Sequence, residues 1–458
     1  METRIIGIDL SVRAAHKAAI LDQASNTFIS PVVSFHTDPA EMDRLLSIAR
    51  SGAADDVRLI AVLEATGMAW YPVSVYLSDR GVEVYRVSGQ QVADQRRVYQ
   101  RRAKSDRIDA RILARLPLTL SERIYPLILP TNPQMALQRA CRELLRLRRQ
   151  STSIKLRLQA MDRLVWLELS DILPPDDPRM YWVREHWYDP WQVLEAGEAA
   201  IAQSWLQASE EPSADLAWVS ALLRQAERAT IVYGSRSRIM GDSLLASVLR
   251  EQSRLEELES QAHWLCLNTI HPLYRQLHPQ RYLETIPGIG QNSAAVYIAF
   301  IGDIRRFPSL SEFRGWTGMI PYSKQSGDAR VSGLHITQAG PDPIKATAFL
   351  NAQVARRWDP QIAAVYHNQM TALGKHYLQA ICACATHLLD RVYVILRDNR
   401  PYELRDVDGT PVDKDVAHRI CQKRYLVPDS VRRHTAHRVR QARREMRLEH
   451  LYERRSQK

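Results

Sequence analysis

Short runs of hydrophobic residues, separated by polar turns, predict a mixed α/β domain at the start of the chain. Residues 3–22 hold two such runs around a polar turn, which predicts a β-hairpin. Apolar runs at 57–64 and 81–88 predict two more strands, with a helix from about Trp70 to Asp79 between them. Residues 90–116 are predicted to be helical, and many of their polar positions are basic.

Apolar side chains recur at spacings of three and four in residues 133–167 and again in residues 243–272. This periodicity predicts two long amphipathic helices. They can pair as a coiled coil, within one chain or between two, or belong to an ordinary helical bundle. Residues 171–215 between them carry ten Asp and Glu against two Arg, together with four Trp. Because acidic side chains repel phosphate, we predict an inserted helical subdomain with a packing or protein-contact role.

The chain has 458 residues, which is enough for two or three domains. The predicted boundaries are 1–118 for the α/β domain, 119–280 for the long helices with the insert at about 171–235, 281–400 for a mostly helical domain, and 401–458 for a basic extension.

The composition adds a preference for polyanionic partners. Hydrophobic residues make up 45% of the chain and charged residues 25%, which is ordinary for a globular protein. The formal net charge is +11, and residues 432–458 alone contribute ten Lys and Arg minus three Glu, or +7. Such an excess favours DNA, RNA or an anionic membrane surface as a partner.

Cysteine usage and hydropathy indicate in which cellular compartment the protein is expected. The five cysteines are scattered and form no CxxC pair, which argues against a disulfide framework or a zinc site. The sequence opens directly into a predicted strand rather than a signal peptide. It holds no run of about 18 apolar residues. We expect a cytoplasmic protein with no membrane partner.

Four carboxylates stand where they could share a metal ion. Asp9 and Glu64 each end a predicted strand, and neighbouring strands can bring such side chains together. Asp106 and Asp109 are three residues apart on a predicted helix and therefore share a face, although a solvated face paired with Arg107 is the simpler interpretation of that spacing alone. Together the four would form an oxygen cage of the kind that Mg²⁺ or Mn²⁺ prefers.

Basic side chains surround the helical pair of carboxylates. Two metal ions about 4 Å apart stabilise the attacking and leaving oxygens in phosphoryl transfer, and cations beside them would hold a nucleic-acid backbone. The candidate backbone-binding residues are Arg96, Arg97, Arg101, Arg102, Lys104 and Arg107.

Residues 286–290, Ile-Pro-Gly-Ile-Gly, are typical of a helix–hairpin–helix motif. Glycines at Gly288 and Gly290 would let backbone N–H groups approach a phosphate at a helix N-terminus. We expect sequence-independent DNA contact here. The alternative is a helix–turn–helix unit that serves packing alone.

Residues 315–340 are rich in Ser, Thr and Gly, which predicts a loop. A loop serine becomes a nucleophile toward a phosphodiester when a metal ion activates it. From the residues alone, Ser323, Ser326 and Ser332 are equal candidates.

In order and spacing these motifs resemble those of the DEDD-type insertion-sequence transposases, the family that includes the Piv DNA invertases. The resemblance covers roughly residues 1–168 and 240–400, and it runs from IGIDLS through LEATG and RAKSDRIDARILA to TIPGIGQNS, KQSG and GLHITQAG. The acidic insert and the basic extension lie outside the usual pattern of the family.

The resemblance implies a RuvC-like N-terminal domain with the RNase H fold, long coiled-coil helices and a mostly α C-terminal domain. The four acidic residues that would bind Mg²⁺ are Asp9, Glu64, Asp106 and Asp109. The C-terminal domain would supply a serine that attacks DNA and forms a phosphoserine intermediate. The Ser-Gly motif of the family falls on Ser326, and Ser332 is the second choice.

The resemblance further implies assembly into a homodimer or homotetramer, in which the acidic site of one subunit meets the serine of another. A structured bridge RNA would pair with the element ends and the target DNA. Two alternatives stay open. A hydrolytic RuvC-like nuclease, such as a junction resolvase, would use the same carboxylates without a protein–DNA linkage. A non-catalytic nucleic-acid-binding protein would use them structurally.

Overall fold

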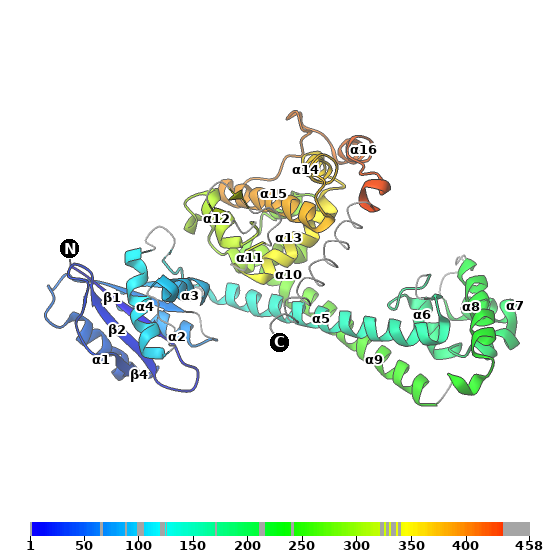
Figure 1. The fold of residues 1–458 in the computed structure, drawn as a ribbon, viewed down its shortest axis with the longest axis horizontal. Helices are drawn as coiled ribbons and strands as arrows, with labels where there is room; N and C mark the ends of the chain where they lie inside the picture. Colours follow the sequence, from blue (N-terminus) through cyan, green and yellow to red (C-terminus); the bar gives the residue numbers. More distant parts are fainter. Residues whose placement is uncertain are drawn as a thin grey trace. The chain divides into compact units, whose positions relative to one another are not determined.

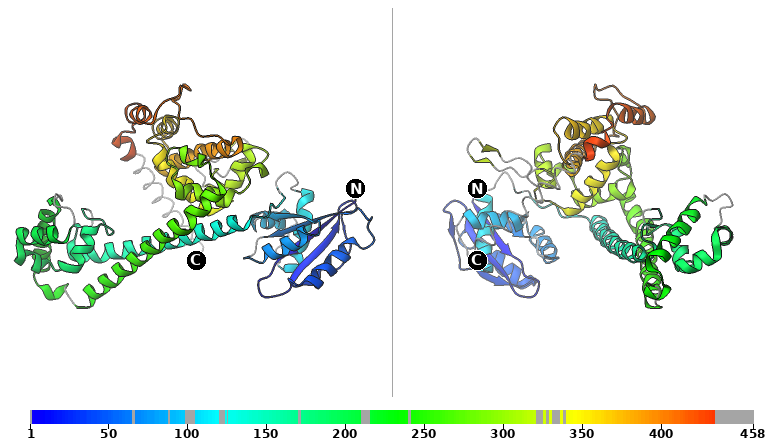
Figure 2. Two further views of the ribbon diagram at one scale, coloured as in Figure 1. Left: turned by 180° about the vertical axis from the view of Figure 1, so that it is seen from behind. Right: turned by 45° about the vertical axis from the view of Figure 1, so that its right-hand side comes forward.

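The computed structural model describes most of the chain, in two compact units (Figures 1 and 2). One unit comprises Met1–Met135 and His278–Lys458, and the other comprises Ala136–Leu277. The described residues are 2–64, 67–87, 89–98, 105–119, 124, 126–169, 172–209, 216–239, 242–320, 325–326, 329–330, 336–337 and 340–433.

A six-stranded mixed sheet forms the centre of the N-terminal region (Figure 1). Its strands are β1 (Thr3–Asp9), β2 (His16–Asp22), β3 (Thr27–Phe28), β4 (Val33–Phe35), β5 (Arg58–Glu64) and β6 (Glu83–Val87). The order is β3-β2-β1-β5-β6, with β4 also paired to β2. β1 runs antiparallel to β2 and parallel to β5, which in turn runs parallel to β6. The predicted hairpin and the two later strands are confirmed.

Helices cover both faces of this sheet, and each face has its own core. Ile6 and Ile8 pack with α1 (Pro39–Arg50) and α2 (Trp70–Ser78) on one face. Their neighbours along β1 point the other way, because side chains alternate along a strand. That second face packs against two helices from the basic predicted segment, α3 (Gly89–Val98) and α4 (Asp106–Thr119).

α4 lies directly on β1 because residue 7 is a glycine. A Cβ atom on Gly7 would lie 2.1 Å from the Ala110 carbonyl oxygen and 2.2 Å from the Ala114 amide nitrogen. Neither backbone atom can yield without moving the helix. The contact between strand and helix backbones therefore fixes where the first turn of α4 lies along β1.

The two long amphipathic helices pair within one chain. α5 (Asn132–Trp166) and α9 (Asp242–Leu265) lie side by side in Figures 1 and 2. Arg157 is ion-paired with Glu251 at 2.8 Å, and Lys155 with Glu259 at 2.7 Å. The later residue on α5 pairs with the earlier residue on α9, so the two helices are antiparallel. A π-helical turn (Cys266–Ile270) continues α9 into α10 (His271–Leu277).

The acidic insert is a helical subdomain, as predicted. It contains α6 (Pro178–His186), α7 (Pro190–Ala208) and α8 (Ala217–Tyr233). Trp182 makes edge-to-face contacts with Trp205 and Trp218, at ring separations of 5.3 and 6.1 Å. Such pairs stabilise a core beyond the area they bury. The tryptophans therefore serve packing.

A buried ion pair joins the insert to the helix pair. Arg184 of α6 and Asp162 of α5 have side chains that are 0% and 1% exposed, and Arg184 Nη2 lies 2.6 Å from Asp162 Oδ2. Arg184 also donates to Gln252 of α9 at 3.3 Å, and Tyr188 donates to Asp162 at 3.3 Å. Breaking such a pair leaves an uncompensated buried charge, so the arrangement holds all three elements in one register.

The C-terminal region is mostly helical. Its helices are α11 (Gln291–Ile301), α12 (Leu310–Thr317), α13 (Asp342–Ala355), α14 (Pro360–Thr371), α15 (Tyr377–Asp398) and α16 (Lys414–Arg424). α15 packs against α12, α13 and α14. In the described part of the chain, α15 alone has the length and composition of a membrane span, and half of that stretch is buried. Packing inside this region accounts for its apolar face.

Part of the predicted extension folds onto these helices. Asp359, which caps α14, is ion-paired with Arg391 of α15 at 3.2 Å and accepts a hydrogen bond from the Tyr402 hydroxyl at 2.8 Å. The Tyr402 amide donates to the Thr285 hydroxyl at 2.7 Å. The beginning of the extension is thus an integral part of the helical region, and residues 434–458 lie outside the described residues.

The cysteines are free and mostly buried, as predicted. Burial raises the pKa of the Cys141 and Cys384 thiols to about 12. Both therefore stay protonated at neutral pH and behave as small apolar packing residues.

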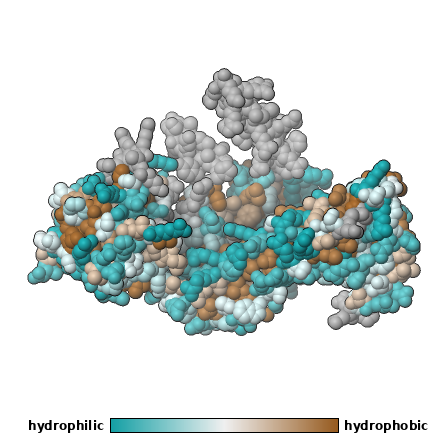
Figure 3. All heavy atoms as spheres, turned by 90° about the horizontal axis from the view of Figure 1, so that it is seen from below, coloured by the Kyte–Doolittle hydropathy of each residue, from teal (hydrophilic) through white to brown (hydrophobic). Residues whose placement is uncertain are grey.

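The face shown in Figure 3 is mainly hydrophilic, with hydrophobic side chains in small separate patches. Individual exposed residues include Val12, Ile231 and Leu426, which are 72%, 81% and 65% exposed. Single exposed apolar residues of this kind are ordinary on protein surfaces.

We predict that Gly7→Ala separates α4 from β1. The added methyl group would overlap backbone atoms, and overpacking of this kind costs roughly 1–3 kcal/mol. Amide hydrogen exchange in β1 and α4 should become faster in the variant. Gly315→Ala in α12 is a matched control, because nothing lies within 4 Å of the added atom. Unchanged exchange in Gly7→Ala would contradict the packing described.

Candidate functional site

Two of the predicted carboxylates lie at one edge of the sheet. In the parallel pair of β1 and β5, Ile8 lies opposite Leu63, so Asp9 and Glu64 follow at neighbouring strand ends. Asp9 lies two residues beyond Gly7, and alternation therefore directs it to the face that α4 covers. Glu64 lies on the same face of the sheet. It follows by two residues Val62, which belongs to the core between the sheet and α3 and α4. Both residues are partly buried.

A glycine makes room beside Glu64. A Cβ atom on Gly89, the first residue of α3, would lie 2.7 Å from Glu64 Oε1. The carboxylate therefore reaches toward the start of α3. A larger residue at this position would press on the Glu64 side chain.

Asp109 lies in the first turn of α4 and is paired with an arginine. The residue is 6% exposed. Arg96 of α3 donates to Asp109 Oδ1 from Nε at 3.0 Å and from Nη2 at 2.6 Å. Asp106, one turn earlier on the same helix, is exposed. The spacing thus places both residues in the first turn of α4, but in different surroundings.

The four carboxylates do not form a closed metal cage. Among the residues that the structure describes, no three His, Cys, Asp or Glu side chains gather closely enough to hold a metal ion. Asp9 and Glu64 lie side by side at the sheet edge, whereas Arg96 already neutralises Asp109. The shared metal site therefore stays a prediction. The Arg96–Asp109 pair was missed from the sequence, where Arg96 counted only as a phosphate-binding residue.

The other predicted backbone-binding residues fall into two groups. Arg97 is exposed and is ion-paired with Asp94 at 3.3 Å, and Arg107 is exposed at the start of α4. The remaining three lie outside the described residues: Arg101, Arg102 and Lys104.

The predicted nucleophile lies on a short strand. β7 (Gln325–Ser326) pairs with β8 (Ala329–Arg330), and Ser326 is opposite Ala329. The prediction of a continuous loop over residues 315–340 was therefore wrong for these strands and for the end of α12. Ser323 and Ser332 lie outside the described residues.

The glycine-rich turn connects a short 3-10 helix (Tyr282–Thr285) to α11. Gly288 has φ +90°, and a Cβ atom on it would lie 2.6 Å from the Asn351 carbonyl oxygen of α13. The Asn351 side-chain amide in turn donates to the Gly288 carbonyl and, at 3.0 Å, to the Ser293 hydroxyl. Gly288 is thus required by packing. No local pattern predicts that Asn351 holds this turn.

Gly290 differs from Gly288. No atom lies within 4 Å of a Cβ placed on it, and the residue is exposed. It is the N-cap of α11, and a glycine offers no side chain to cap this helix end. Backbone N–H groups at a helix start favour anions.

Known protein families match both parts of the chain that carry the predicted motifs. A profile described as transposase matches residues 6–164, and one described as transposase of the IS116/IS110/IS902 family matches residues 280–367. The 43.6 kDa protein of insertion element IS110 from Streptomyces coelicolor is 24% identical over 354 residues, which are 76% of this chain and 84% of that protein.

Two further relatives match shorter stretches. The pilin gene-inverting protein of Moraxella bovis is 28% identical over 128 residues, which are 28% of this chain and 40% of that protein. The 42 kDa protein of insertion element IS900 from Mycobacterium paratuberculosis is 26% identical over 215 residues, or 46% and 51% of the two chains.

The sheet domain and the helical region together therefore define a transposase, an enzyme that acts on DNA. The chain belongs to the IS110 family of insertion-sequence transposases and site-specific recombinases. The family resemblance inferred from the motifs is confirmed.

We predict that Arg96→Gln destabilises the N-terminal domain by roughly 1–3 kcal/mol, because the largely buried Asp109 carboxylate loses its charged partner. Arg97→Gln is the matched control on the same helix. Its exposed pair with Asp94 is worth about 0–1 kcal/mol. Chemical denaturation of the two variants measures the difference. Equal stabilities would mean that the Arg96–Asp109 pair is not formed in solution.

Proposed function

We propose that the chain cleaves and exchanges DNA strands by phosphoryl transfer, with a carboxylate-bound divalent cation and a serine nucleophile. The observation that carries this proposal is the placement of Asp9 and Glu64 at adjacent strand ends, beneath the helix that bears Asp106 and Asp109. The proposal includes the RuvC-like, RNase H-type fold that the family resemblance implies, and the mixed sheet of this domain supports it.

The donor chemistry fits Mg²⁺ or Mn²⁺. All four candidate ligands are carboxylates, which are hard oxygen donors, and the Gly89 position leaves space at Glu64. When bound, the ion would polarise the scissile phosphate and neutralise developing charge. Asp9, Glu64, Asp106 and Asp109 would hold it.

Arg96 would have two roles in such a site. Without a cation it neutralises Asp109, as its two hydrogen bonds indicate. Once Asp109 turns to a cation, Arg96 is free to bind a DNA phosphate, since guanidinium groups recognise phosphate and carboxylate with the same geometry. Arg97 and Arg107 are exposed nearby in sequence and would hold the backbone.

Ser326 is the proposed nucleophile. Its Oγ attacks the phosphorus in line, an Oγ–P bond forms, and the P–O bond to one deoxyribose breaks. The serine proton is lost, and the departing sugar oxygen gains one. A hydroxyl of the incoming strand then attacks the phosphoserine and releases the serine. The number of phosphodiester bonds is conserved, so rejoining needs no ATP.

The remaining parts of the proposal are those that the family resemblance implies. The partners would be the element ends and target DNA, a structured bridge RNA that pairs with both, and further copies of the chain in a dimer or tetramer. A hydrolytic RuvC-like nuclease is the alternative function. It would rest on the same carboxylates and would leave no protein–DNA adduct.

We predict that Asp9→Ala and Asp106→Ala each reduce Mg²⁺-dependent strand cleavage by roughly 100-fold or more, because each removes a charge that holds the cation at the reacting phosphate. Asp94→Ala on exposed α3 surface is the control. Mg²⁺ should also raise the melting temperature of the wild-type and control proteins more than that of the two variants. Full cleavage by either variant would remove that residue from the site.

We predict that Ser326→Ala abolishes covalent protein–DNA adducts, because the substitution removes the proposed attacking hydroxyl. Ser332→Ala should form them at the wild-type level. The adducts are detected on denaturing gels after incubation with labelled element-end DNA, with and without the cognate RNA. Adducts in Ser326→Ala that disappear in Ser332→Ala would transfer the role to Ser332. Cleavage without adducts in the wild-type protein would favour the nuclease.

A further inference from the structure

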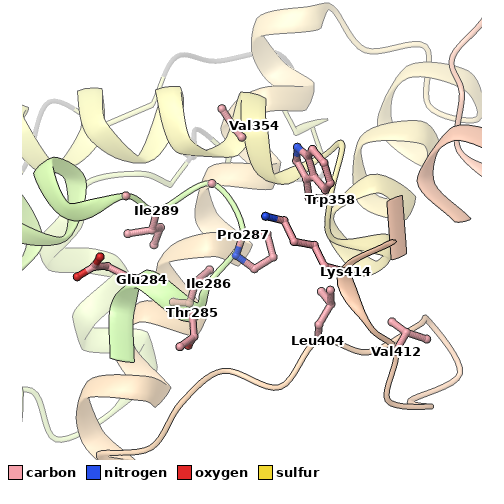
Figure 4. A pocket seen from close by; sticks show the side chains of 12 residues that line it. Glu284, Thr285, Ile286, Pro287, Ile289, Val354, Trp358, Leu404, Val412 and Lys414 are labelled. Atoms are coloured by element: carbon pink, nitrogen blue, oxygen red, sulfur yellow. The ribbon is translucent and has the colours of Figure 1, made fainter. Parts of the chain in front are cut away.

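The glycine-rich turn forms one wall of an open pocket of about 630 Å³ (Figure 4). The turn contributes Pro287, Gly288 and Gly290 to this wall. Val354 and Trp358, at and just beyond the end of α13, line a second side. The folded part of the extension completes the pocket through Leu404, Val412 and Lys414. These last three residues lie beyond the region matched by the transposase profile, which ends at residue 367.

Lys414 brings a positive charge into this pocket. It is the first residue of α16, and Figure 4 shows its side chain extending toward the turn at Pro287, where the ammonium group ends between this turn and Trp358. Its Nζ lies 5.1 Å from the centre of the Trp358 ring. Among the described residues Lys414 forms no ion pair, so its charge is available to a ligand.

The position of Lys414 is built into the fold. The Trp358 ring stacks on His418, one turn along α16, at a ring separation of 4.1 Å. A hydrogen bond of 2.8 Å also joins His418 Nδ1 and the Arg357 carbonyl. Asp413, beside Lys414, is occupied as the N-cap of α16, where it accepts from the Val416 amide. These contacts hold the start of α16 against the pocket.

The remaining charge in the pocket lining is already neutralised. Glu284 is ion-paired with Arg281 at 2.6 Å. The free charge in the pocket is therefore positive, and the turn contributes the exposed Gly290 to the lining. An ammonium group that has no carboxylate partner suits a phosphate. The apolar side chains of the pocket lining would contact the adjoining sugar.

We propose that this pocket binds a backbone phosphate of DNA, with Lys414 as its cationic ligand and Trp358 as the residue that positions Lys414. The proposal rests on the DNA-recombinase function proposed above and deepens it. The extension, which lies beyond the region matched by the transposase profile, would thus add a DNA contact to the glycine-rich turn.

Binding to a short DNA duplex, measured in EDTA at several salt concentrations, tests this proposal without catalysis. Lys414→Gln should weaken binding about 5-fold and lower the slope of log affinity against log salt by about 0.9, the share of one phosphate contact. Lys414→Arg should retain most of the affinity and most of the salt slope of the wild-type protein. Trp358→Leu should weaken binding with an unchanged melting temperature of the C-terminal region.

Lys423→Gln is the matched control. Lys423 is exposed on the same helix nine residues later, which is half a turn out of phase, and it does not line the pocket. Equal salt slopes for Lys414→Gln and the wild-type protein, or equal losses in Lys414→Gln and Lys423→Gln, would overturn the proposal. A loss confined to RNA binding would also overturn it. A wild-type protein that binds no DNA would instead contradict the proposed function itself.

Discussion

The close contact between the backbones of β1 and α4 is the constraint on which the acidic site depends. A glycine on the strand and two alanines on the helix let the two elements approach until only main-chain atoms separate them. The first turn of α4, which bears Asp106 and Asp109, then has one position along β1. Without this contact the acidic residues of strand and helix would share a domain but no defined geometry.

Charge balance explains how one of the acidic groups, Asp109, can be largely buried. Carboxylates repel, and a largely buried one needs a partner. Arg96 supplies that partner for Asp109 through two hydrogen bonds from the neighbouring helix. The same guanidinium would suit a phosphate if the proposed cation replaced it as the partner of Asp109, and no buried charge would then be left unpaired. The Arg96 side chain would then contribute both to folding and to DNA binding.

Local periodicity explains which elements could be predicted from the sequence. The β1–β2 hairpin, β5 and β6 follow from short apolar runs, and both long helices follow from the spacing of three and four. The pairing of the helices within one chain was among the expected options. The Arg96–Asp109 pair depends on how α3 sits against α4, which no local pattern encodes. Asn351 and Gly288 are 63 residues apart. Trp358 and Lys414 meet only because the chain returns after α15, and β7 and β8 are too short to show alternation.

The buried ion pair between Arg184 and Asp162 has a consequence for how such an insert can be exchanged between relatives. Val165 and Trp166 at the end of α5 are fully buried in the core shared with the insert. Excision of α6–α8 would strand the Asp162 carboxylate and uncover an indole, so a short linker could not simply replace them. A viable chimera would also need the tip of the helix pair recoded with polar residues. The insert and the end of the helix pair that supports it therefore form a single packing unit.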